Sequence, residues 1–292
     1  MIKRSLAILF IGVILTSVAP AQVPKSAIES IRRKAEAGDC NSQLSLGFIY
    51  LRGNGVVRDS AKAAQWFSKA ADQADPKAQL NLGLLYATGD GVQKDSTAAA
   101  QLFKKAAEQG DPAAQYNLGV VYSGGIGFPK DAERAVFWYR KAAAQGELNA
   151  ESNLGTMIAL GEGAPKDLRK AIQSFVKAAN QGHSGAQFNL GLMYFNGTGV
   201  PKDYEKAVLW YRKAAEQGEG LAQYNLGLMF YNTEGVRKNF PLAYVWMNLA
   251  AAQGVEGAKN VRSDLERKLT RAQLQEAQKL SAKLGDVIVS MP

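Results

Sequence analysis

A Leu-Gly pair recurs through this chain at a constant interval of 36 residues. The pair stands at 46–47, 82–83, 118–119, 154–155, 190–191 and 226–227. A second landmark keeps the same period, since short Ala-rich segments end at Gly38, Gly110, Gly146, Gly182, Gly218 and Gly254, with Ala74 in the remaining slot. A fixed period in the thirties is typical of a solenoid, in which similar supersecondary units stack on one another.

Each copy is expected to form two helices. In the copy at 75–110, Asp75 can cap the first helix and Gly89 can end it in the left-handed conformation. Asp95 can then cap a second helix that stops at Gly110. The predicted fold is all-α. It is a right-handed α-solenoid of six 36-residue helix-pair repeats, at 39–74, 75–110, 111–146, 147–182, 183–218 and 219–254.

The glycine of each Leu-Gly pair lies inside the first helix, where glycine costs roughly 1 kcal/mol relative to alanine. We attribute it to packing, because a glycine facing the Ala-Ala pairs of the second helix would let the two backbones approach closely. The side chains expected to fill the space around this contact are Tyr122, Tyr194, Trp138 and Trp210. Replacing such a tryptophan by alanine is then expected to cost ~3–5 kcal/mol.

The two ends differ from the repeats. Residues 26–38 resemble a second helix alone, and residues 22–38 are expected to form an N-terminal capping helix. Residues 255–292 are expected to form C-terminal capping helices. Residues 1–21 combine a basic start, an apolar stretch at 5–18 and a small-residue ending, which is typical of a secretory signal peptide. We expect cleavage after Ala21 and a periplasmic or secreted protein, an uncleaved membrane anchor being the alternative.

The repeated residues carry a family resemblance. The pattern A-x-x-x-L-G-x-x-Y-x-x-G-x-G-V-x-x-D…K-A…W-Y-x-K-A-A-x-x-G is similar to the Sel-like repeat (SLR), a branch of the tetratricopeptide superfamily, and it covers residues 39–254. The fourth copy departs from it, with Ile158 for the tyrosine and Ser174 for the tryptophan, and the sixth has Thr233 for the first turn glycine. The resemblance implies an exported bacterial adaptor or scaffold whose partner is another protein.

Reactive side chains give weak signals of chemistry. Ser174 and Lys177 form a Ser-x-x-Lys pair, but the further motifs of the enzymes that use such a pair do not accompany it. His183, the single histidine, occupies a helix-capping slot, and Cys40, the single cysteine, cannot form an intramolecular disulfide. No catalytic residue, no cofactor and no metal site is predicted.

Partner binding is expected on the first helices, which line the concave surface of tetratricopeptide-type stacks. An apolar and aromatic row opposite the Leu-Gly stripe could hold a peptide or helix, and a repeated asparagine could bond its backbone. The alternatives are packing between neighbouring helices and hydrogen bonds between them. The expected binding residues are Phe48, Leu84, Tyr116, Phe188, Leu192, Phe195, Tyr224, Leu228 and Tyr231, with Asn81, Asn117, Asn153, Asn189 and Asn225.

The chain carries a formal net charge of +9. This excess could favour an anionic component of the cell envelope, or it could reflect solvated Lys and Arg scattered over the helices. Export argues against nucleic acid as a partner, and we expect a monomer. The sequence thus predicts a non-catalytic scaffold that binds a partner peptide or protein. Two alternatives are a cell-envelope enzyme, either β-lactamase-like or a peptidoglycan-acting hydrolase, and a purely structural envelope protein.

Overall fold

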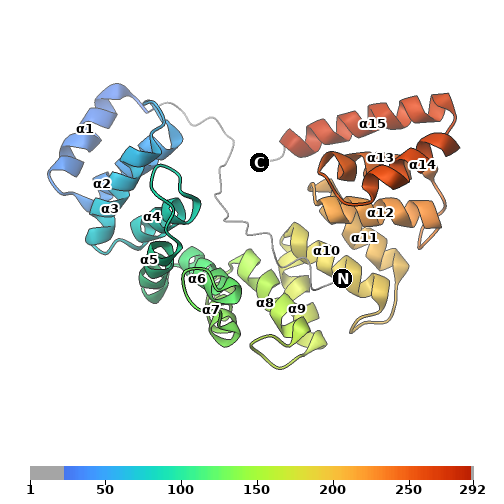
Figure 1. Ribbon diagram of the computed structural model, residues 1–292, viewed down its shortest axis with the longest axis horizontal. Helices are drawn as coiled ribbons and strands as arrows, with labels where there is room; N and C mark the ends of the chain where they lie inside the picture. Colours follow the sequence, from blue (N-terminus) through green and yellow to red (C-terminus); the bar gives the residue numbers. More distant parts are fainter. Residues whose placement is uncertain (1–22, 291–292) are drawn as a thin grey trace. The chain divides into compact units, whose positions relative to one another are not determined.

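The computed structural model describes residues 23–290, which form fifteen α-helices and no strand (Figure 1). The predicted signal peptide and its cleavage site lie outside the described residues. The first helices of the copies are α2 (Cys40–Arg52), α4 (Pro76–Thr88), α6 (Pro112–Gly124), α8 (Leu148–Leu160), α10 (Ser184–Asn196) and α12 (Gly220–Asn232). The second helices are α3 (Ser60–Asp72), α5 (Ser96–Glu108), α7 (Ala132–Ala144), α9 (Leu168–Asn180), α11 (Tyr204–Glu216) and α13 (Phe240–Ala252). The remaining helices are α1 (Lys25–Glu36), α14 (Ala258–Lys268) and α15 (Arg271–Ser290).

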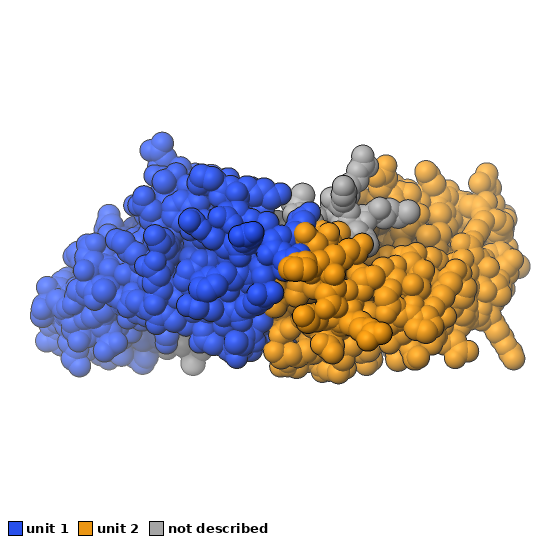
Figure 2. Space-filling model, turned by 90° about the horizontal axis from the view of Figure 1, so that it is seen from below, with its two compact units in different colours: residues 1–150, 162–164 blue, residues 151–161, 165–292 orange. Residues whose placement is uncertain are grey.

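The chain divides into two compact units (Figure 2). The described part of unit 1 runs to residue 150 and includes 162–164, and unit 2 holds 151–161 and the residues from 165 onward. Within each unit, a first helix packs on the second helix of its own copy, and that second helix packs on the first helix of the next copy, as α4, α5 and α6 do in unit 1. The all-α repeat architecture predicted from the period is confirmed.

Polar side chains fix the helix starts as the sequence predicts. The Asp75 carboxylate accepts a hydrogen bond from the Ala78 amide at 2.7 Å, and Asp95 accepts from the Ala98 amide at 2.9 Å. His183 replaces the acidic cap, since its Nδ1 accepts from the Ala186 amide at 3.0 Å. Each bond satisfies an N–H that the first turn of a helix leaves without a partner.

Among residues 23–290, two residues other than glycine adopt the left-handed conformation. Ala74 has φ of 66° and Thr233 has φ of 68°, in slots that other copies fill with glycine. The left-handed region costs an L-residue about 1–2 kcal/mol, and a β-branched side chain is the least suited to it.

We therefore expect Thr233→Gly to raise the free energy of unfolding by about 1 kcal/mol, with Ala74→Gly changing it in the same direction. Urea denaturation of the purified protein measures both effects. Thr97→Gly is the control, since Thr97 lies in the first turn of α5 with ordinary helical geometry and the change should lower stability. Equal losses at Thr97 and Thr233 would contradict the assignment of strain.

The repeated glycine faces an aromatic ring of the second helix in the first five copies and Met247 in the sixth. A Cβ on Gly119 would lie 2.6 Å from Cδ1 of Tyr139, and a Cβ on Gly83 would lie 2.7 Å from Cε1 of Phe103. The same Cβ on Gly83 would lie 3.4 Å from the Ala99 carbonyl oxygen, so the backbones also come close. The glycine thus makes room for a ring as well as for a backbone.

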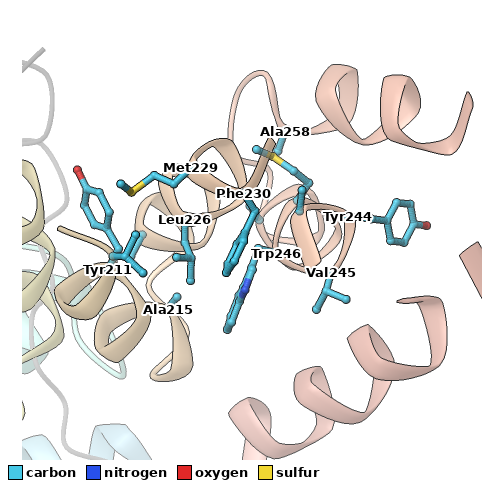
Figure 3. Close-up of a cluster of buried hydrophobic side chains, with 14 of the residues drawn as sticks. Tyr211, Ala215, Leu226, Met229, Phe230, Tyr244, Val245, Trp246 and Ala258 are labelled. Carbon is cyan, nitrogen blue, oxygen red and sulfur yellow. The ribbon is translucent and has the colours of Figure 1, made fainter. Parts of the chain in front are cut away.

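The prediction that the tryptophans fill this contact is wrong. Tyr139 and Tyr211 are buried, with 2% and 1% of their surface exposed, whereas Trp138 and Trp210 are only half-buried. Successive helix residues point about 100° apart, so only one member of each Trp-Tyr pair can face the glycine. Figure 3 shows Tyr211 in the core of unit 2 together with Leu226 and Trp246, and this last tryptophan, in the sixth copy, is buried.

The C-terminal helices cover the end of unit 2. Thr270 and Gln273 form a capping box at the start of α15, in which Thr270 Oγ1 accepts from the Gln273 amide at 3.3 Å and Gln273 Oε1 accepts from the Thr270 amide at 3.1 Å. Ala277 and Ser281 are buried, and Leu274 and Leu284 pack against the same core. None of the helices in residues 23–290 has the length and apolar character needed to cross a membrane.

Candidate functional site

Charge separates the two kinds of helix. The second helices α3, α5, α7, α9 and α11 carry thirteen basic and five acidic residues, and the sixth, α13, carries none of either kind. The six first helices together carry two basic residues and one acidic residue. We call the surface formed by the first helices within each unit the first-helix face. A surface with so little charge suits a partner that presents apolar and uncharged polar groups.

The predicted apolar row lies on the first-helix face, and most of it is half-buried. Phe48 packs edge-on against Phe67 with ring centroids 5.2 Å apart, and Tyr116 lies 6.0 Å from Tyr139. These side chains therefore rest on second-helix rings of their own copies while keeping part of their surface accessible. The half-buried members are Phe48, Leu84, Tyr116, Leu192, Phe195, Tyr224, Leu228 and Tyr231.

Phe188 differs from the rest of this row. Only 8% of its surface is exposed, and its ring lies 5.9 Å from Tyr211 in the core of unit 2. Burial raises the pKa of the Tyr211 phenol beside it. Phe188 therefore packs in the core beneath the first-helix face. Leu192 and Leu228 are the more accessible apolar side chains on α10 and α12.

Tyr231 ends the row beside a charged cluster. Its hydroxyl donates to Asp264 at 2.6 Å, and Lys268 binds both the Asp264 carboxylate and the Tyr231 oxygen. The hydrogen bond from Lys268, followed by that from Tyr231, lowers the pKa of Asp264, so its carboxylate stays ionised at neutral pH. These bonds hold the Tyr231 ring in place at the edge of the first-helix face.

Side chains of the asparagine row make hydrogen bonds within the molecule. The Asn81 and Asn117 amide nitrogens donate to the Lys77 and Ala113 carbonyls of their own helices, at 2.7 and 2.8 Å. Asn225 makes a side-chain hydrogen bond with Tyr211 of the preceding copy. Asn153 and Asn189 are half-buried. Each of these two bonds uses one of the two N–H donors of its amide, so part of the hydrogen-bonding capacity that the row could offer to a peptide backbone is already engaged at Asn81 and Asn117.

Sequence reasoning missed a lattice of buried glutamines. The Gln223 side chain is fully buried; its Nε2 donates to the Ala215 carbonyl of the preceding copy at 3.1 Å, and its Oε1 accepts from Gln253 Nε2 at 2.9 Å. The same pair of bonds joins the copies of unit 1, where the buried residues are Gln43, Gln79 and Gln115. Their common spacing of 36 residues was the available signal.

The fourth copy replaces this glutamine by Glu151. The buried Glu151 carboxylate lies 2.6 Å from Lys177 Nζ, an ion pair that takes up the lysine of the Ser-x-x-Lys motif. Ser174 is itself buried, with 9% of its surface exposed. A serine nucleophile needs access to substrate and a base ready to take its proton. Both features favour a structural role for Ser174 and Lys177.

Cys40 is half-buried, and its thiol donates a weak hydrogen bond to the Ala70 carbonyl at 3.9 Å. Burial, and then the nearby Asp75, raise the pKa of this thiol, which favours its protonated form. Among the described residues, His, Cys, Asp and Glu side chains do not gather in the groups of three that a metal site requires.

Comparison with known families matches the Sel1 repeat at 41–75, 76–111, 112–147, 148–183, 184–219 and 220–255. The chain belongs to the Sel1 repeat family. Sel1 repeats commonly mediate interactions between proteins and generally lack catalytic activity. The matched segments begin one or two residues after the expected repeat starts, so the resemblance recognised in the sequence is confirmed.

Two solved structures share the fold of this Sel1 repeat protein. A protective antigen of uropathogenic Escherichia coli strains, which displays an SLR fold, is 36% identical with a TM-score of 0.83, over 91% of this chain and 58% of the antigen. A Sel1 repeat protein from Oxalobacter formigenes is 32% identical with a TM-score of 0.71, over 78% of this chain and 88% of that protein.

A curated relative is known by its ligand. The secretory immunoglobulin A-binding protein EsiB of Escherichia coli is 36% identical over 68 residues, which make up 23% of this chain and 14% of EsiB. This Sel1 repeat protein therefore spans about one seventh of EsiB and somewhat over half of the antigen.

Proposed function

We propose that this Sel1 repeat protein is a non-catalytic scaffold of the cell envelope that binds a partner protein through its first-helix face. The observation that carries the proposal is the contrast between that face, with apolar rings and few charges, and the basic second helices. The signal-like sequence at 1–21 supports export. The repeat family supports a protein as the partner.

The chemistry of the face defines the partner. On α10 and α12, Leu192, Leu228 and Tyr224 offer half-buried apolar surface, while neither helix carries a charged residue. A segment with apolar anchors and few charges would lose little hydration there. EsiB provides a precedent for partner binding, but the likeness to it covers too little of either chain to assign an immunoglobulin as the ligand.

Charge placed on this face tests the proposal. We expect Leu192→Lys with Leu228→Lys to abolish capture of partner proteins from an envelope extract, because a partner would have to desolvate two ammonium groups. Immobilised protein and mass spectrometry of the captured set provide the measurement. Leu209→Lys is the matched control, since Leu209 is half exposed on the second helix α11 of the same unit.

Circular dichroism first establishes that all variants are folded. A partner set that survives the double change on the first-helix face, or that is lost equally with Leu209→Lys, would contradict the proposal. The first result would show that the partners bind a surface other than the first-helix face.

A further inference from the structure

We propose that two patches on the second helices dock onto the surface of an anionic lipid bilayer. The α7 patch consists of Phe137, Arg140 and Lys141, and the α11 patch consists of Leu209, Arg212 and Lys213. The two patches occupy the same slots of the repeat in different units. Each is argued by itself, and neither belongs to the first-helix face on which the proposed protein partner binds.

The basic groups of the patches are available to an external partner. Arg140, Lys141, Arg212 and Lys213 are exposed, and the ion pairs formed within residues 23–290 do not include any of them. By contrast, Arg134 and Lys206, one turn before each patch, pair with the helix-capping Asp131 and Asp203.

Acidic neighbours reduce the positive charge only partly. Glu133 lies on α7, and Glu205 and Glu216 lie on α11. Each patch keeps two cations side by side, and the second helices as a group remain basic. Lys and Arg near an anionic bilayer each contribute about 1 kcal/mol to binding.

An exposed apolar side chain lies among the cations of each patch. Phe137 and Leu209 each leave 50% of their surface exposed, although most large apolar side chains of the described residues are covered. Phe137 also borders a shallow depression of about 480 Å³ that Val136, Arg140 and Lys141 help to line. Apolar groups that project between cations can enter the region beneath the lipid headgroups.

Half-buried tryptophans stand next to these apolar side chains. Lys141 Nζ lies 5.1 Å from the centre of the Trp138 ring, and Lys213 Nζ lies 4.6 Å from that of Trp210. Tryptophan and lysine are residues that favour the boundary between water and lipid. A soluble acidic polymer or acidic protein segment would satisfy the cations but would offer no acyl layer to Phe137 and Leu209, so these observations favour a bilayer.

Vesicle co-sedimentation tests the proposal. The chain starting at residue 22 is used, because the apolar stretch at 5–18 would itself enter bilayers. We expect binding to vesicles of phosphatidylcholine with phosphatidylglycerol and none to phosphatidylcholine alone. Changing Arg140, Lys141, Arg212 and Lys213 to Gln should weaken binding at least about 30-fold, the effect of two cations lost from one engaged patch.

The matched control removes the same number of charges elsewhere. It changes to Gln the exposed residues Arg52, Lys77, Lys279 and Lys283, which lie on first helices and on α15. This variant should bind vesicles within a few-fold of the unchanged chain. An equal loss of vesicle binding in the two quadruple variants would show that net charge alone drives binding, and it would contradict the proposal of two specific patches.

A second variant separates a bilayer from an acidic polymer. Phe137→Ser with Leu209→Ser keeps every charge and should weaken vesicle binding about tenfold, while binding to polyglutamate should not change. If this variant binds vesicles as well as the unchanged chain, the patches recognise charge alone and the bilayer proposal fails. Absence of vesicle binding by the unchanged chain at low salt would also reject it, while leaving the first-helix proposal standing.

Discussion

Tyr211→Ala is expected to lower the free energy of unfolding by ~3–5 kcal/mol, whereas Trp210→Ala, one position earlier, should cost roughly 1–2 kcal/mol. Tyr211 has 1% of its surface exposed and lies against Gly191, Phe188 and Phe195. Removing its ring leaves a cavity that its neighbours cannot fill. Trp210 is half-buried, and Lys213 covers its ring from the solvent side.

Urea denaturation followed by circular dichroism compares the two variants. The residue pair Trp138 and Tyr139 offers an independent repetition in unit 1, with the same order of effects expected. A larger loss at the tryptophan than at the tyrosine in either copy would contradict the packing described for the repeated glycine.

Gly191→Ala is expected to lower stability by about 1–3 kcal/mol, although alanine is the better helix former by about 1 kcal/mol. The added methyl group would fall well inside van der Waals contact with Cδ1 and Cε1 of Tyr211. The Tyr211 ring is enclosed by the core of unit 2 and cannot move aside without disturbing other contacts.

Gly285→Ala is the matched control, because Gly285 also lies inside a helix, α15, and its new Cβ would lie 3.5 Å from Leu249 Cδ2, an ordinary contact. That substitution should raise the free energy of unfolding by up to about 1 kcal/mol. The same denaturation experiment measures both variants. The expected result is a lower free energy of unfolding for Gly191→Ala and a higher one for Gly285→Ala. Stabilisation by both substitutions would show that the repeated glycine is not needed for packing.

Much of the fold follows from short-range chemistry in the sequence. Asp75 and Gly89 mark the start and end of α4 because a capping carboxylate and a left-handed residue act within a few positions. His183 is placed correctly as a cap for the same reason. Thr233 adopts the left-handed conformation because this position of the repeat requires it, as the positive φ of the equivalent glycines in other copies shows.

Long-range packing could not be predicted in the same way. Trp210 and Tyr211 are adjacent and both suit a core, so the sequence pattern does not decide which one faces Gly191. The choice depends on the rotation of α11 against α10, which is a property of the assembled copies. Gln223 was missed because a lone glutamine usually lies on the surface, and its burial makes sense only once Ala215 and Gln253 are in place.

The sequence predicted which residues lie in the candidate site, but it did not predict which of them are buried in the core and which stay accessible. Phe188 and Leu192 are both apolar residues of one row, yet the first belongs to the core and the second stays partly accessible. The charge contrast between first and second helices could have been counted from the sequence. It becomes informative only when the helices are assigned to separate layers.

The hydrogen bonds of the buried glutamines constrain the length of each copy that contains one. One of its bonds joins residues 30 positions apart and the other joins residues 8 positions apart, as Gln109 to Gln79 and Gln79 to Ala71 show. These two spans together enclose every turn of a copy, so an added residue must loop out or break one of the bonds. The copies that carry the glutamine keep one register without a single insertion, which is the outcome such a constraint would produce, while the fourth copy has Glu151 in this slot and an ion pair to Lys177 instead.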